Sequence, residues 1–223
     1  MTLGSNAVLS GLMVDPVLLW GVIVLAFVGS ITPGPNNLMV MASAAAFGWR
    51  RAVPHMLGIM FGFGIMNASV TAGIGAVILE VPILLGIVKY GGAAWLFWLA
   101  IKMARATLQK SDKSDATKGT AARPFTIIEA MLFQWVNPKG WAIALAVAGG
   151  YVELSPSIAV RTILISVIFM AFTPVANGTW MAAGEVLRRV FDDPKSGKVF
   201  GLIMAALIAA TALMIVLDPT RLS

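Results

Sequence analysis

Six apolar segments, each long enough to cross a lipid bilayer, limit what this chain can fold into. A helix needs about 20 apolar residues to span the hydrocarbon core. Of the 223 residues, 59% are hydrophobic and 12% are charged, about half the charged fraction of a soluble domain. The segments run over residues 17–47, 54–79, 83–101, 125–148, 158–187 and 199–217. The sequence therefore predicts an all-α integral membrane protein, with residues 1–223 forming a single transmembrane domain.

The distribution of basic residues predicts the topology. Twelve of the 16 Lys and Arg residues fall in one set of loops and three in the opposite set. The first set is Arg50, Arg51, Lys102, Arg105, Lys110, Lys113, Lys118, Arg123, Arg188, Arg189, Lys195 and Lys198; the second is Lys89, Arg161 and Arg221. The positive-inside rule then requires six spans with both termini outside. Basic loops facing an anionic cytoplasmic leaflet also explain the net charge of +6 without a nucleic-acid partner.

Six spans divide into two halves of three, and three spans per half give the halves opposite orientations in the membrane. Two halves of three spans with opposite orientations form a 3+3 inverted repeat. We expect the first half to cover residues 1–101 and the second to cover residues 125–223. Residues 102–124 are rich in Lys, Ser, Asp, Thr and Gly, so we expect them to form a solvated, mobile cytoplasmic loop.

A run of six residues interrupts the first apolar segment with the sequence Thr32-Pro33-Gly34-Pro35-Asn36-Asn37. Two prolines flanking a glycine cannot keep a regular helical hydrogen-bond ladder. In hydrocarbon, such a break survives only where protein or a watery cavity covers it. It is either a packing kink or part of a substrate site built on broken helices at mid-membrane depth.

The fourth segment has a matching break at Asn137-Pro138-Lys139. At about 1.5 Å per residue, both breaks lie about 20 Å from the face where their segments enter. Corresponding positions in two inverted halves favour a two-sided substrate site over a packing kink. The candidate substrate-binding residues are Pro33, Gly34, Pro35, Asn36, Asn37, Gln134, Asn137, Pro138 and Lys139. Asn67, Thr173 and Asn177 are further candidates for its polar lining.

The polar candidates have alternative roles. The amides of Asn36, Asn37, Asn137 and Gln134 could pair with one another and satisfy freed backbone groups. The polar side chains of the second and fifth segments, Asn67, Thr173 and Asn177, could instead form hydrogen bonds that hold helices together. An ammonium deep in a span faces a cavity or a partner unless it snorkels outward, so we expect Lys139 to attract a substrate carboxylate. Half-helices that start near Pro35 and Pro138 would expose N–H groups to an anion. We also expect Thr173-Pro174 to interrupt the fifth segment.

Several kinds of chemistry are excluded by composition. The chain has no cysteine and one histidine, His55, which rules out thiol chemistry and argues against His-clustered zinc. Glu80 lies at an outer end, and Glu129 and Glu185 lie near inner ends, so no central carboxylate is available as a proton carrier. We expect no enzyme activity, no catalytic residue, no cofactor and no metal.

The motifs occur in the order found in a known family. Five elements of the sequence carry the resemblance: the first break, Phe47-Gly48 with Arg50-Arg51, the glycines Gly58 and Gly62, residues 89–96 (KYGGAAWL), and Asn137-Pro138-Lys139. Together they resemble the lysine-exporter-type superfamily, in particular its homoserine/threonine resistance branch. Residues 133–139 and 177–180 look most like the branch of cysteine and O-acetylserine exporters. Some members of the family carry an aspartate at the position of Asn36, so selectivity for cationic amino acids is less secure here.

The resemblance implies a function. It points to a secondary transporter in the bacterial inner membrane that exports amino acids or their derivatives, driven by the proton gradient as an antiporter. Its partners would be a small amino-acid substrate and the lipid bilayer. The alternative is a passive channel or a membrane interaction subunit without driven transport. The substrate, the coupling ion and the oligomeric state stay open, because glycine and alanine faces serve internal packing or a homo-oligomer equally well.

Overall fold

The computed structural model describes residues 13–109, 123–190 and 194–217, and within these ranges it is almost entirely helical and contains no strand. The helices of the first half are α2 (Pro16–Ile31), α3 (Pro35–Phe47), α4 (Trp49–Ser69), α5 (Gly75–Glu80) and α6 (Pro82–Gln109). Those of the second half are α7 (Ile127–Phe133), α8 (Pro138–Gly150), α9 (Ile158–Val190) and α10 (Pro194–Leu217). Single turns η1 (Val70–Ile74), η2 (Gln134–Val136) and η3 (Val152–Leu154) link some of them. The prediction of an all-α chain is confirmed.

The described residues include helices long and apolar enough to cross a membrane. In the described part, the stretches Trp49–Val77 and Ile158–Arg189 are long and apolar enough to cross a bilayer. The pair α2 and α3, bent by 50° at their break, qualifies as a third span. This agrees with an integral membrane protein, whereas the full six-span 3+3 arrangement stays a prediction.

Both predicted breaks are present. Helix α2 begins at Pro16, where the Asp15 carboxylate caps it, and ends at Ile31, and α3 restarts at Pro35. The fourth segment is divided into α7, η2 and α8, and α8 restarts at Pro138. Proline suits the first turn of a helix because its missing N–H would lack an intrahelical partner there anyway.

Two expectations about helix ends were wrong. Helix α9 runs unbroken through Pro174, because one proline removes a single ladder hydrogen bond, a loss that neighbouring helices can compensate. Helix α6 continues to Gln109, so residues 102–109 of the expected loop are helical. Good helix formers such as Lys102, Ala104, Arg105 and Leu108 explain this extension. Residues 110–122 lie outside the described residues.

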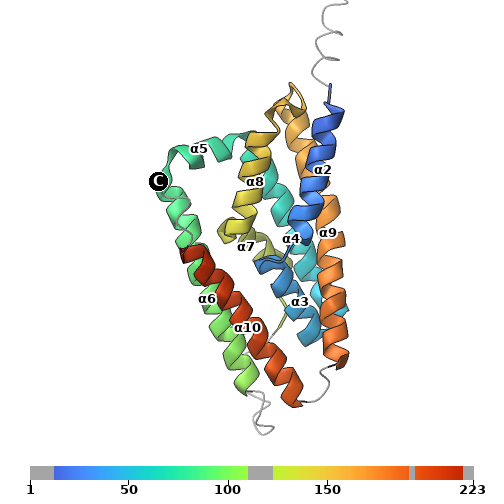
Figure 1. Cartoon of the computed structure of the whole chain (residues 1–223), viewed down its shortest axis with the longest axis vertical. Coiled ribbons are helices and arrows are strands. Elements are labelled where there is room, and N and C mark those ends of the chain that lie inside the picture. The colour runs from blue at the N-terminus through green and yellow to red at the C-terminus, as the bar shows by residue number, and fades with distance from the viewer. Residues whose placement is uncertain (1–12, 110–122, 191–193, 218–223) are drawn as a thin grey trace, which may run out of the picture.

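The helices pack in a pattern that crosses the two halves. Helices α4 and α9 contact each other, α2 and α3 pack on α9, and α7 packs on α4. Each broken segment therefore contacts the helix that forms the middle segment of the other half, which is α9 for α2 and α3 and α4 for α7. Helices α6 and α10 lie side by side on one flank of the molecule (Figure 1). An edge-to-face contact between Phe63 and Phe169, with ring centroids 5.3 Å apart, joins α4 to α9 in the core.

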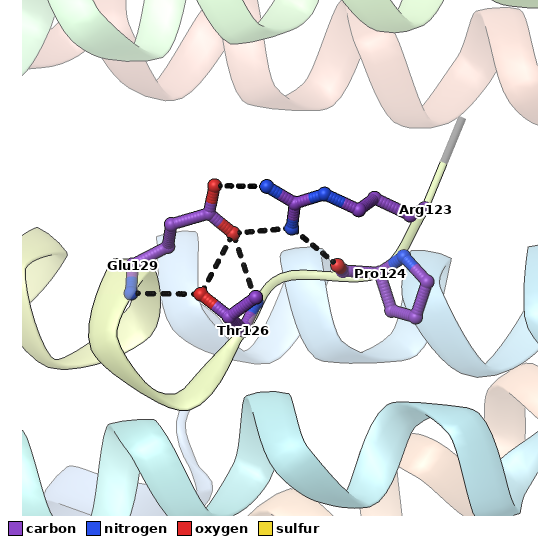
Figure 2. A network of polar contacts seen from close by, with 4 residues as sticks. All are labelled: Arg123, Pro124, Thr126 and Glu129. Carbon is purple, nitrogen blue, oxygen red and sulfur yellow. Dashed lines mark hydrogen bonds and ion pairs between the residues drawn. The ribbon is translucent and has the colours of Figure 1, made fainter. Parts of the chain in front are cut away.

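The start of α7 is fixed by a polar network (Figure 2). The Thr126 hydroxyl accepts a hydrogen bond from the Glu129 backbone N–H, and the Glu129 carboxylate accepts from the Thr126 backbone N–H, which forms a capping box. Arg123 donates to both carboxylate oxygens of Glu129, at 2.7 and 2.6 Å. This pairing raises the pKa of the Arg123 guanidinium. The network sets where helix α7 begins.

Helix α6 contacts the second break through one glycine, which leads to a first prediction. A Cβ on Gly92 would overlap the carbonyl oxygen of Val136 in η2, whereas a Cβ on Gly91 would meet nothing within 4 Å. We expect Gly92→Ala to be less stable than Gly91→Ala by about 1–3 kcal/mol through overpacking. Both variants share the same gain in helix propensity, so their thermal unfolding in detergent isolates the clash. Equal unfolding temperatures would show that α6 does not press on the break.

Candidate functional site

The first break leaves the last carbonyl groups of α2 without partners in their own helix. Asn37, in the first turn of α3, donates its Nδ2 to the carbonyls of Ser30 at 2.9 Å and Thr32 at 2.8 Å. The Trp180 indole N–H, on α9, donates to the Ile31 carbonyl at 3.0 Å. Side chains from α3 and α9 thus replace the missing ladder and make the break a stable structure.

Lys139 joins the second break to the first. Its Nζ donates to the Thr32 carbonyl at 2.6 Å, to the Thr32 hydroxyl at 3.0 Å and to the Pro33 carbonyl at 3.3 Å. A cation is stabilised at this place because a helix C-terminus carries partial negative charge. The lysine stem passes close to Gly34, where an added Cβ would lie 2.6 Å from Lys139 Cδ. The expectation that Lys139 faces a cavity or a partner agrees with this geometry.

A reciprocal amide pair forms a second link between the halves. Asn36 Nδ2 donates to Gln134 Oε1 at 2.8 Å, and Gln134 Nε2 donates to Asn36 Oδ1 at 3.2 Å. Gln134 Nε2 also donates to the Ala130 carbonyl at 2.8 Å. The Gln134 side chain is fully buried, so it matches the alternative in which the amides satisfy one another and nearby backbone.

The two restarting helices differ at their N-termini. At α8, the Asn137 side chain accepts a hydrogen bond from the Lys139 backbone N–H. At α3, no side chain caps the helix and Pro35 has no N–H. The backbone N–H groups of Asn36 and Asn37 therefore have no partner within their helix. The start of α3 is consequently the more suitable of the two for an anionic group.

A small pocket lies between the two breaks, enclosed by α2, α3, α4, α8 and α9. Its polar lining comes from Ser30, Asn36, Asn37, Asn137, Lys139, Thr173 and Asn177, and Ile59, Phe63 and Ile143 add apolar surface. The pocket has a volume of about 30 Å³, enough for only two or three water molecules at about 10–15 Å³ each. Its lining must therefore move to admit anything as large as an amino acid.

Two groups that line this pocket have no hydrogen-bond partner among the described residues: the Ser30 hydroxyl and Asn177 Nδ2. The Asn177 side chain is only 2% exposed. Leaving a buried polar group unpaired costs about 1–3 kcal/mol, so such groups call for an explanation. Two of them in one pocket are available to hydrogen-bond a polar ligand or water there. No Asp or Glu is among the described residues that line it.

The candidate residues divide into three groups. The pocket brings together Gly34, Asn36, Asn37, Asn137, Lys139, Thr173 and Asn177. Pro33, Pro35, Pro138 and Gln134 lie next to it and shape or brace the breaks without lining it. Asn67 is fully buried elsewhere on α4, where it donates to the Phe63 carbonyl at 2.9 Å. Ser30 and Trp180 were missed, although Ser30 lies just before the break and Trp180 follows Asn177 within one helical turn.

Broken apolar helices around a polar pocket are an arrangement found in membrane transport proteins. Comparison with known families supports this class, because residues 7–218 match the model of the LysE type translocator family. The chain belongs to this family, and the resemblance noted from its motifs is confirmed.

Curated relatives extend the comparison. A cysteine/O-acetylserine efflux protein of Shigella flexneri serotype 5b (strain 8401) is 25% identical over 201 residues, which cover 90% of this chain and 98% of the relative. A protein of the same name from Escherichia coli (strain K12) is 25% identical over 187 residues, covering 83% of this chain and 91% of the relative. No solved structure matches the chain.

Proposed function

We propose that this protein exports amino acids or amino-acid derivatives from the bacterial cytoplasm and binds them in the pocket between the two breaks. The observation that carries the proposal is the contact of Lys139, at the second break, with the carbonyls of Thr32 and Pro33 at the first. The family, and relatives named for the efflux of cysteine and O-acetylserine, support the class of substrate.

The first break has a suitable partner for each of the two charged groups of a zwitterion. The C-terminal carbonyls of α2 carry partial negative charge and suit an ammonium, while the uncapped N-terminus of α3 suits a carboxylate. Asn177 Nδ2 and the Ser30 hydroxyl, both without a partner among the described residues, add a donor and a donor–acceptor in the same pocket. With no carboxylate in the described lining, we favour a substrate of zero net charge over a cationic amino acid.

Transport would proceed by alternating access between the two halves. The packing of α2 and α3 on α9, and of α7 on α4, supports a 3+3 inverted repeat. In such a repeat the two broken segments rock about a fixed central site. We place the protein in the inner membrane with its basic loops in the cytoplasm and both termini in the periplasm. The driving force would be the proton gradient.

Efflux from reconstituted vesicles tests this function. Vesicles are loaded with radiolabelled O-acetyl-L-serine, L-cysteine, L-threonine or L-lysine, and initial efflux rates are measured with and without a pH gradient. We expect saturable efflux of neutral substrates, stimulated when the outside is acidic, and little efflux of L-lysine. Non-saturable flux that ignores the gradient would favour the passive channel. No flux of any amino acid would favour an interaction subunit.

A further inference from the structure

We propose that the Lys139 ammonium is a built-in substitute for the ammonium of the substrate, and that the substrate must displace it in order to bind. This inference rests on the proposed function and gives one residue of the site a role that the family assignment does not supply. Lys139 then acts as a competitor tethered inside the pocket.

The surroundings of Nζ form an ammonium site. A lysine ammonium has three N–H donors and no acceptor. The two Thr32 oxygens and the Pro33 carbonyl lie within 2.6–3.3 Å of Nζ, so three acceptors match three donors. They lie at the C-cap of the half-helix α2 and one residue beyond it, next to a helix end where a cation is favoured. The α-ammonium of an amino acid presents the same charge and the same three donors.

Two ammonium groups cannot share this site. The pocket has space for only a few water molecules. No carboxylate in the described lining could offset a second positive charge, and like charges at short range repel strongly. One ammonium must therefore leave before the other enters.

Displacement is feasible because the lysine stem is long and mobile. The stem has four carbons joined by rotatable bonds. It passes Gly34, whose lack of a side chain leaves room for it. Once displaced, Nζ can pair with the substrate carboxylate at the start of α3. The link between the breaks would then open only when substrate has replaced it, which couples binding to rearrangement of the two halves.

Three matched ligands separate this role from a simple carboxylate contact. O-acetyl-L-serine carries both charged groups, 2-aminoethyl acetate lacks the carboxylate, and 3-acetoxypropanoate lacks the ammonium. Binding to purified wild-type and Lys139→Met protein is measured by calorimetry. Removing an internal competitor raises the apparent affinity by the reciprocal of the fraction of sites that it left free, so a tenfold gain means that about a tenth of the sites were free. We expect the variant to bind 2-aminoethyl acetate at least about tenfold more tightly and to bind 3-acetoxypropanoate no more tightly than wild type does. O-acetyl-L-serine should gain less than 2-aminoethyl acetate, because it also loses the pairing of its carboxylate with Nζ.

A second substitution excludes a general effect of the lost positive charge. Thr32→Val removes one of the three oxygen acceptors. In the Lys139→Met background it should weaken both amines and leave 3-acetoxypropanoate unchanged, whereas a general charge effect would not depend on Thr32. Lys139→Gln, a polar replacement, repeats the comparison if the methionine variant does not fold.

The outcomes distinguish this inference from the function on which it rests. If Lys139→Met binds 2-aminoethyl acetate no more tightly than wild type does, and binds O-acetyl-L-serine and 3-acetoxypropanoate more weakly, Lys139 is only a carboxylate ligand and the displacement role alone is overturned. The same titration with L-cysteine and L-threonine covers other neutral substrates. If no amino acid binds either protein, the proposed function fails and the inference fails with it.

Discussion

Lys139→Ala is expected to reduce the initial rate of amino-acid efflux at least about tenfold while the protein still inserts into the membrane. The substitution removes every hydrogen bond from Lys139 Nζ to Thr32 and Pro33. Those bonds belong to the empty protein; the contact that speeds transport is the charge-assisted hydrogen bond of Nζ to the substrate carboxylate, worth about 1.5–3 kcal/mol, and about 1.4 kcal/mol corresponds to tenfold in rate. The loss falls on turnover, because the variant can bind substrate but has no ammonium to pair with its carboxylate during the rearrangement.

Lys102→Ala provides the matched control. Lys102 lies on α6 outside the described pocket, with its Nζ 4.9 Å from the centre of the Trp98 ring. Its loss changes the net charge by the same amount and should leave efflux unchanged. Rates are normalised to the amount of inserted protein. If Lys139→Ala exports amino acids at the wild-type rate, the second break is not part of the substrate site.

Asn36→Ala is expected to destabilise the protein by about 1–3 kcal/mol, because it leaves the fully buried Gln134 carboxamide without its partner across the halves. Removing both groups should cost less than the sum of the single losses. The double variant Asn36→Ala/Gln134→Ala should therefore show a clearly non-additive free energy of unfolding. Thermal and denaturant unfolding of the two single variants and the double variant measure this coupling. Additive losses would mean that the amide pair does not hold the halves together.

The two breaks could be predicted from sequence because their cause is local. Pro33, Pro35 and Pro138 lack the N–H that a helix ladder needs, which favours a break at these positions. The same rule was wrong at Pro174, where packing of α9 against its neighbours outweighs the loss of one hydrogen bond. A single proline therefore does not locate a break by itself, since Pro138 marks one and Pro174 does not, whereas the run Pro33-Gly34-Pro35 excludes a continuous ladder.

The contacts between the breaks could not be predicted, because they join residues far apart in the chain. Asn36 and Gln134 are 98 positions apart, and Ile31 and Trp180 are 149 positions apart. Sequence placed an ammonium at mid-membrane depth but could not give the direction of its side chain, which depends on how α8 packs against the end of α2. Ser30 was missed for the same reason, since only the folded structure shows that its hydroxyl is buried in the pocket.

Substrate protection at a single introduced thiol locates the export site most directly. The chain has no cysteine, so Ser30→Cys places one near-isosteric thiol in the pocket, and Met13→Cys places another at an exposed position before α2. The rate of alkylation by a small maleimide is measured in active vesicles with and without saturating O-acetyl-L-serine. A site between the breaks predicts that substrate slows alkylation at position 30 several-fold and leaves position 13 unchanged. Equal alkylation at position 30 with and without substrate, in protein that still exports it, would contradict that site.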